Sequence, residues 1–139
     1  MYQSLVKEQQ LFTGINCYHF GSLDQGLFTI EGQLVKGIAI EAAEAAVEAE
    51  LDKVRQMPPD TRELEKVKNK TESVMAFEDM SVMNRAGSLA FYELLGDGEI
   101  MNEEHERYRK VTAEDIHRLA QTILLPHNSN TLYYLAAQD

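Results

Sequence analysis

Cysteine, tryptophan and proline are scarce in this sequence, whose 139 residues include one Cys, no Trp and three Pro. The single thiol, Cys17, cannot form an internal disulfide, so a disulfide-stabilised fold is excluded. A chain of this length buries about two thirds of its unfolded surface on folding, and 44% of its residues are hydrophobic. The composition therefore predicts a single globular domain that needs neither a disulfide nor a structural metal for stability.

Basic residues are also few. Thirteen lysines and arginines stand against 23 aspartates and glutamates, which gives a formal net charge of −10 at pH 7. Such a chain repels nucleic acid and anionic membrane surfaces, so neither is predicted as a partner. No apolar run approaches the about 20 residues that a membrane-spanning helix requires, and residues 1–8 lack the basic start and apolar centre of a signal peptide.

The first part of the chain has the pattern of a β-hairpin followed by a helix. Residues 10–20 and 26–34 are rich in Phe, Ile, Thr and Tyr, and the Gly and Asp residues between them supply the backbone freedom of a turn. After Gly37, apolar residues recur at three- and four-residue steps, which predicts one face of a helix that ends at Pro58. The residues of this face are Ile40, Ala43, Val47, Leu51 and Val54.

The middle of the chain is predicted to be helical as well. Asp60 and Glu63 have the spacing of a capping box, which indicates the start of a second helix. A weakly marked junction at 78–81 leaves two interpretations open, either two helices or one bent helix, and Gly96 offers a left-handed stop. A shorter helix is expected at 99–111.

The end of the chain combines one more helix with a strand. Thr112 and Asp115 have capping-box spacing for a helix that ends before Pro126, and residues 130–136 have the composition of a closing strand. The sequence therefore predicts an α+β, two-layer fold. We expect a mostly antiparallel sheet, made of the hairpin and the C-terminal strand, to be covered on one face by four or five helices. Residues 1–139 are expected to form a single domain or a partial domain, because three strands make a narrow sheet for so many helices and suggest further strands upstream.

His105 is the first candidate for a metal ligand. Residues 101–105 read M-N-E-E-H and so share the Glu-His end of the H-x-x-E-H metallopeptidase motif. That motif needs two imidazoles one helical turn apart to hold Zn²⁺, and a Glu to activate the metal-bound water. Met101 occupies the first ligand position here, and a thioether is too weak to replace an imidazole. An acidic, solvated helix that carries a His is the simpler interpretation.

The other candidates for chemistry are weaker. His117 is expected on the outward face of its helix and His127 in a loop, while His19 and Cys17 share a strand face but make only two ligands. There is no G-x-S-x-G elbow and no phosphate-binding glycine loop. No catalytic, metal-binding or cofactor-binding residue is therefore predicted. Four methionines are expected to fill the core rather than to line an adaptable binding surface. These are Met75, Met80, Met83 and Met101.

Five stretches, in order and spanning nearly the whole chain, resemble the pitrilysin/insulinase family of zinc peptidases, whose members include the mitochondrial processing peptidases. The stretches are 5–12 (LVKEQQLF), 24–32 (DQGLFTIEG), 63–70 (ELEKVKNK), 90–97 (AFYELLGD) and 108–116 (YRKVTAEDI). In this family two related α+β halves enclose a peptide chamber, and the N-terminal half holds zinc through H-x-x-E-H and a later Glu. The resemblance implies half of a metallohydrolase-like domain.

The resemblance transfers no functional residue to this chain. Its stretches correspond to the later part of one half, downstream of the zinc motif, so the strands that precede the hairpin in the family would lie before Met1. Some non-catalytic halves contact the peptide through an Arg and a Tyr in the pattern L-R-x-K-x-x-L-x-Y. Alignment of Leu5 and Leu11 with its leucines places Val6 at the Arg and Thr13 at the Tyr. Neither residue can make a charge-assisted bond to a peptide carbonyl.

The leading hypothesis is a non-catalytic C-terminal part of a zinc protease, forming a chamber wall and the interface to a catalytic half in the same protein or in a partner subunit. Zn²⁺ is expected only in that half, and peptide is expected to bind only to the full-length protein. A catalytically silent scaffold or assembly subunit on the same fold is the alternative, and a small metal-dependent enzyme based on His105 or His19 is a third reading. An exposed sheet edge in such a fragment is also expected to favour strand pairing between copies, and so a homodimer, as an effect of the truncated sheet and not of the biology of the protein.

Overall fold

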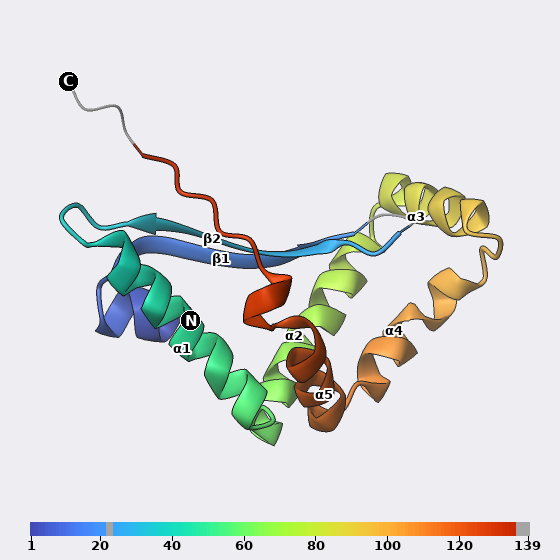
Figure 1. Ribbon diagram of the computed structural model, residues 1–139. Helices are drawn as coiled ribbons and strands as arrows, with labels where there is room; N and C mark the ends of the chain where they lie inside the picture. Colours follow the sequence, from blue (N-terminus) through green and yellow to red (C-terminus); the bar gives the residue numbers. More distant parts are fainter. Residues whose placement is uncertain (22–23, 136–139) are drawn as a thin grey trace.

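The computed structural model describes residues 1–21 and 24–135, and it consists of an antiparallel hairpin followed by helices (Figure 1). A π-helical turn, η1 (Tyr2–Glu8), precedes β1 (Phe12–Phe20) and β2 (Leu27–Leu34). The helices that follow are α1 (Ile40–Gln56), α2 (Thr61–Glu78), α3 (Val82–Leu94), α4 (Ile100–Lys110) and α5 (Ala113–Ile123), with a short 3₁₀ turn η2 (Pro126–Asn128). The predicted α+β class is confirmed, whereas the turn η1 was not predicted.

The hairpin packs Phe12 and Ile15 against η1 and α1. The two strands pair from Phe20↔Leu27 to Phe12↔Leu34, with an irregularity between Phe12 and Gly14. Across this irregularity both Phe12 and Ile15 are buried. Gly32, on the opposite strand, leaves room for the Phe12 ring, because a Cβ at Gly32 would lie 2.6 Å from a ring carbon.

The hydrophobic core is small and lies where η1, the hairpin and α1 meet. Leu5, Phe12, Ile15 and Ala43 are buried together there. Partly buried apolar residues surround them, namely Met1, Val6, Leu11, Ile30, Leu34, Ile38, Ala46 and Val47. Within the described ranges this cluster contains no residue of α2 to α5. The sheet is therefore covered by η1 and α1, whereas α5 packs on α1, and α4 packs on α2 and α3.

The predicted closing strand is not formed. Residues 130–135 pair with neither strand of the hairpin, and residue 136 lies outside the described residues. A β-rich composition makes a strand only where a neighbouring backbone offers hydrogen bonds. Here the segment extends from η2 without joining the sheet (Figure 1). Its side chains bind α1 instead, because Thr131 Oγ1 and Tyr133 OH donate to the two carboxylate oxygens of Glu44 at 3.1 and 2.7 Å.

Local capping signals explain where several helices begin and end. The capping box of Thr112 and Asp115 is formed, with both side chain to backbone bonds at 3.1 Å. Asp60 precedes α2 as predicted, but its side chain makes no capping bond, so that capping box is wrong. Ser81 caps α3, which makes α2 and α3 two helices. Gly96 has φ +104°, which confirms the left-handed stop after α3.

Candidate functional site

The histidines make structural contacts or lie on the surface. His105 Nε2 lies 3.5 Å from Asp79 Oδ2, across the contact between α4 and the end of α2. His117, expected on the outward face of α5, instead lies 2.9 Å from the backbone carbonyl oxygen of Arg55 through its Nε2. That expectation is wrong because α5 packs against the C-terminal part of α1. His127 lies exposed in η2.

The remaining pair of candidate metal ligands lies on β1. Cys17 and His19 share one face of the strand and are exposed, and Cys17 Sγ lies 3.4 Å from Met1 Sδ. Across residues 1–21 and 24–135, no three side chains of His, Cys, Asp or Glu are placed to hold a metal ion together. The residues present do not fit the zinc ion that H-x-x-E-H peptidases bind, so no step of zinc chemistry is assigned to this chain.

The two positions aligned with the family's peptide-binding pair have ordinary structural roles. Val6 packs beside the buried core. Thr13 is exposed, and its hydroxyl donates to the backbone carbonyl oxygen of Gln33 at 3.1 Å. Neither side chain carries the charge or the phenol group with which an Arg or a Tyr would bind a peptide.

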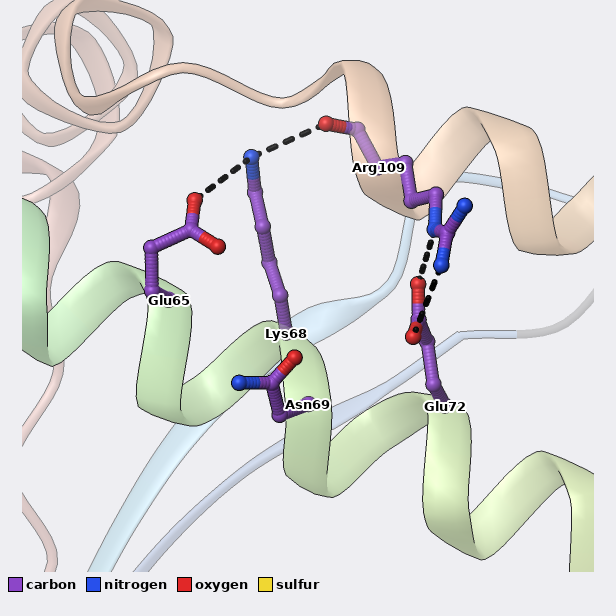
Figure 2. A pocket seen from close by; sticks show the side chains of 5 residues that line it. All are labelled: Glu65, Lys68, Asn69, Glu72 and Arg109. Carbon is purple, nitrogen blue, oxygen red and sulfur yellow. Dashed lines mark hydrogen bonds and ion pairs between the residues drawn. The ribbon is translucent and has the colours of Figure 1, made fainter.

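A polar hollow of about 280 Å³ lies between α2 and α4 (Figure 2). Glu65, Lys68, Asn69 and Glu72 line it from α2, and Arg109 closes it from α4. This site was not predicted from the sequence, because its residues come from two separate helices and form no recognisable motif.

Charged groups in the hollow neutralise one another. The Arg109 guanidinium donates to both carboxylate oxygens of Glu72, and these bonds hold the pKa of Glu72 below its usual value. Lys68 Nζ donates to the backbone carbonyl oxygen of Arg109 at 2.9 Å and lies 3.8 Å from Glu65. The two acidic and two basic side chains leave no net charge in the hollow. They connect α2 to α4 by ion pairs and hydrogen bonds, an arrangement that we call a clasp, and they offer neither a nucleophile nor a metal site.

A second polar clasp joins α1 to α5. The Arg55 side chain donates to Glu48, to Asp52 at 2.5 Å and, across the helix contact, to the backbone carbonyl oxygen of Leu124. Gln121 Nε2 donates to the Arg55 carbonyl oxygen at 3.1 Å. Ion pairs and hydrogen bonds thus connect α5 to α1 and α4 to α2.

Large apolar side chains remain on the surface. The expectation that the methionines fill the core is wrong for Met80 and Met83, which are 78% and 80% exposed. The chain as a whole, at 15.8 kDa, exposes 11,227 Å². A compact monomeric protein of this mass exposes about 7,300 Å². The fold therefore presents far more surface than a self-contained domain of its size.

The first half of the chain matches a known protein family. A family model described as the peptidase M16 inactive domain matches residues 1–71, which include η1, the hairpin, α1 and the first half of α2. The chain belongs to this family. The inactive-domain match thus includes the entire buried cluster at η1, and it confirms the predicted resemblance to a non-catalytic part of a zinc peptidase.

Three solved structures have the same fold as this inactive domain. The inactive peptidase domain of a candidate zinc protease from Bordetella parapertussis is 22% identical over 99% of this chain and 75% of that chain, with a TM-score of 0.84. A candidate zinc protease from Bordetella pertussis Tohama I is 23% identical over 98% of this chain and 75% of that chain, also at 0.84. A protease from Helicobacter pylori is 20% identical over 86% of this chain but only 29% of that chain, at 0.78. No curated protein matches the sequence.

None of the described helices combines the length and the apolar character required to cross a membrane.

Proposed function

We propose that this chain acts as the non-catalytic domain of a zinc peptidase, where it forms one wall of the peptide chamber and the interface to the catalytic half. The observation that carries the proposal is membership in the inactive-domain family. The exposed area supports it, because it exceeds that of a compact protein by about 3,900 Å², which is enough for upstream residues of the same domain and for a partner surface of about 800 Å².

The catalytic half, in the same protein or in a partner subunit, would supply the zinc ion, its ligands and the general base. This chain would supply surface, so that a peptide is enclosed between two walls and held away from bulk water. Residues 1–139 would be part of such a domain. The share of the Bordetella chains that this chain spans, 75% in each case, supports this extent.

Reconstitution with a polypeptide that carries H-x-x-E-H and is encoded in the same or a neighbouring gene tests the proposal. Hydrolysis of a quenched fluorescent peptide would be measured for the chain alone, for the catalytic polypeptide alone and for the two together, with zinc determined by elemental analysis in each preparation. We expect neither hydrolysis nor zinc in the chain alone, and a clear rise in hydrolysis when the two are mixed.

Two results would contradict the proposal in different ways. Peptide hydrolysis or stoichiometric zinc in the purified chain would show that it is itself an enzyme. A stable complex in which hydrolysis is the same with and without the chain would instead indicate a catalytically silent scaffold. A variant of the catalytic polypeptide with its H-x-x-E-H glutamate replaced by Gln serves as the control for contaminating peptidases, because it should bind the chain without hydrolysing peptide.

A further inference from the structure

Helix α3 is apolar over much of its surface and contains no buried residue. Its main contacts are with α4, and it lies at the far end of the helical arc from η1 (Figure 1). Together with the last turn of α2 and the α2–α3 junction it carries six large apolar side chains that are 51% to 82% exposed. We call these the α3 patch, and they are Phe77, Met80, Val82, Met83, Leu89 and Leu94.

An uncovered helix of this composition is unusual for a protein that acts alone. Monomeric proteins rarely expose contiguous apolar patches larger than a few hundred Å². The two methionines at the α2–α3 corner add flexible, polarizable side chains that adapt to the shape of a partner. The patch thus has the properties of the buried centre of an interface.

Charges at both ends of the patch restrict the partner. Glu78 and Asp79 lie between Phe77 and Met80 at its start, and Glu93, Asp97 and Glu99 lie around its end at Leu94, whereas the only basic residue between positions 78 and 99 is Arg85. A second copy of this chain would place one acidic rim against another, at a net charge of −10 for each copy. Like charges at an interface are unfavourable, and opposite charges accelerate association. The rim therefore favours a partner that presents lysine or arginine.

We propose that the α3 patch inserts into an apolar groove bordered by lysine or arginine on the catalytic half of the peptidase. The inference rests on the proposed function and adds to it the element that makes the contact and the chemistry of the surface that receives it. The hairpin tip and the C-terminal segment also expose apolar side chains, but they lack the clustered acidic residues that flank α3.

Photo-crosslinking identifies the residues that cover α3. The photoreactive residue p-benzoylphenylalanine would replace Met83 in the full chain, within its complex with the catalytic polypeptide, and the crosslinked peptide would be sequenced by mass spectrometry. We expect a crosslink to an apolar segment of the catalytic polypeptide with Lys or Arg nearby. The matched control carries the same group at Leu132, which is even more exposed, and should not crosslink to that segment. A crosslink from position 83 to a second copy, or to another segment of this chain, overturns the proposal.

Affinity measurements test the same contact without a bulky probe. The double variant Met83→Gln, Leu94→Gln should bind the catalytic polypeptide about tenfold more weakly or worse, because it places two polar amides at the apolar centre of the interface, where single side chains have effects of this size. Leu132→Gln should bind like the wild type. Glu78→Lys should slow association by a factor that shrinks as salt is added, whereas Glu31→Lys, on the hairpin, should not.

The outcomes separate this inference from the proposed function. If the wild-type chain binds and raises hydrolysis but the α3 variants bind equally well, only the role of α3 is wrong. If the wild-type chain does not bind the catalytic polypeptide at all, both are wrong. Circular dichroism of each variant checks that the fold is intact, which is expected because the substituted side chains contact mainly solvent.

Discussion

Replacement of Leu5 by alanine should be the most damaging small change in this chain. Leu5 is the one large side chain with 0% exposure among residues 1–21 and 24–135, and it joins η1 to the hairpin and α1 through Phe12, Ile15 and Ala43. The substitution removes three buried carbon atoms and leaves a cavity, which costs about 2–5 kcal/mol in a well-packed site. Because η1 is a short terminal turn that can partly close the space, we expect about 3 kcal/mol. Small domains have a total stability of about 5–15 kcal/mol, so this loss is a large fraction.

Urea unfolding followed by circular dichroism measures the free energy of unfolding of the Leu5→Ala variant against wild type. The same chemical change at Leu132, which is 93% exposed, should alter stability by less than about 0.5 kcal/mol. Leu5→Met nearly preserves the side-chain volume, so it should recover most of the lost free energy of unfolding. It also provides a measurable comparison if the alanine variant is already unfolded without urea. A loss below about 1 kcal/mol for Leu5→Ala would show that η1 is not part of the core.

Three further predictions use matched variants. Gly32→Ala should destabilise the hairpin, because its Cβ would collide with a buried phenylalanine ring, whereas Gly14→Ala, with nothing within 4 Å, should be neutral or stabilising in thermal melts. Arg109→Ala should speed hydrogen exchange in α4 by breaking the clasp to α2, whereas Arg107→Ala, paired only within its own helix, should not. Bonds from Thr112 lower the folded-state pKa of the Asp115 carboxyl. The stabilisation from the Asp115 carboxylate is therefore present above the pKa of the unfolded state and lost as the pH falls through the lower pKa of the folded state. Asp115→Asn should be less stable than wild type at neutral pH but equally stable in acid. Denaturation at the two pH values measures this difference.

Most of the secondary structure could be predicted because its signals are local. The glycines between two β-rich stretches indicate the hairpin, and the apolar stripe that includes Ala43 indicates α1 and the face that it buries. The Thr112 capping box likewise lies within a single turn. By contrast η1, with seven residues, is too short for a periodic pattern, and its Leu5 became recognisable as a core residue only through contacts with the hairpin.

Apart from the Asp60 capping box, which is a local error, the main errors concern contacts between segments that are distant in the sequence. The closing strand at 130–136 was predicted from tyrosine and leucine content, but a strand also needs a partner backbone. His117 was assigned to the outward face of α5 because the neighbouring polar residues suggested it, and only the position of α1 shows otherwise. The Arg109–Glu72 pair is separated by 37 residues and has no sequence signature.

The positions of the buried apolar residues and of the ion pairs explain why so much apolar surface stays exposed. Among the described residues, the cluster of buried apolar side chains lies at one end, around Leu5, and α5 adds one small buried residue, Ala120. The contacts of α5 with α1 and of α4 with α2 include the Arg55 and Arg109 clasps. Ion pairs at a surface contribute little to stability, with a median of about 0–1 kcal/mol each, so these helices keep apolar side chains exposed that a self-contained domain would bury. An arrangement of this kind is expected where another polypeptide completes the core. The acidic residues that flank α3 then determine the charge that this polypeptide must present.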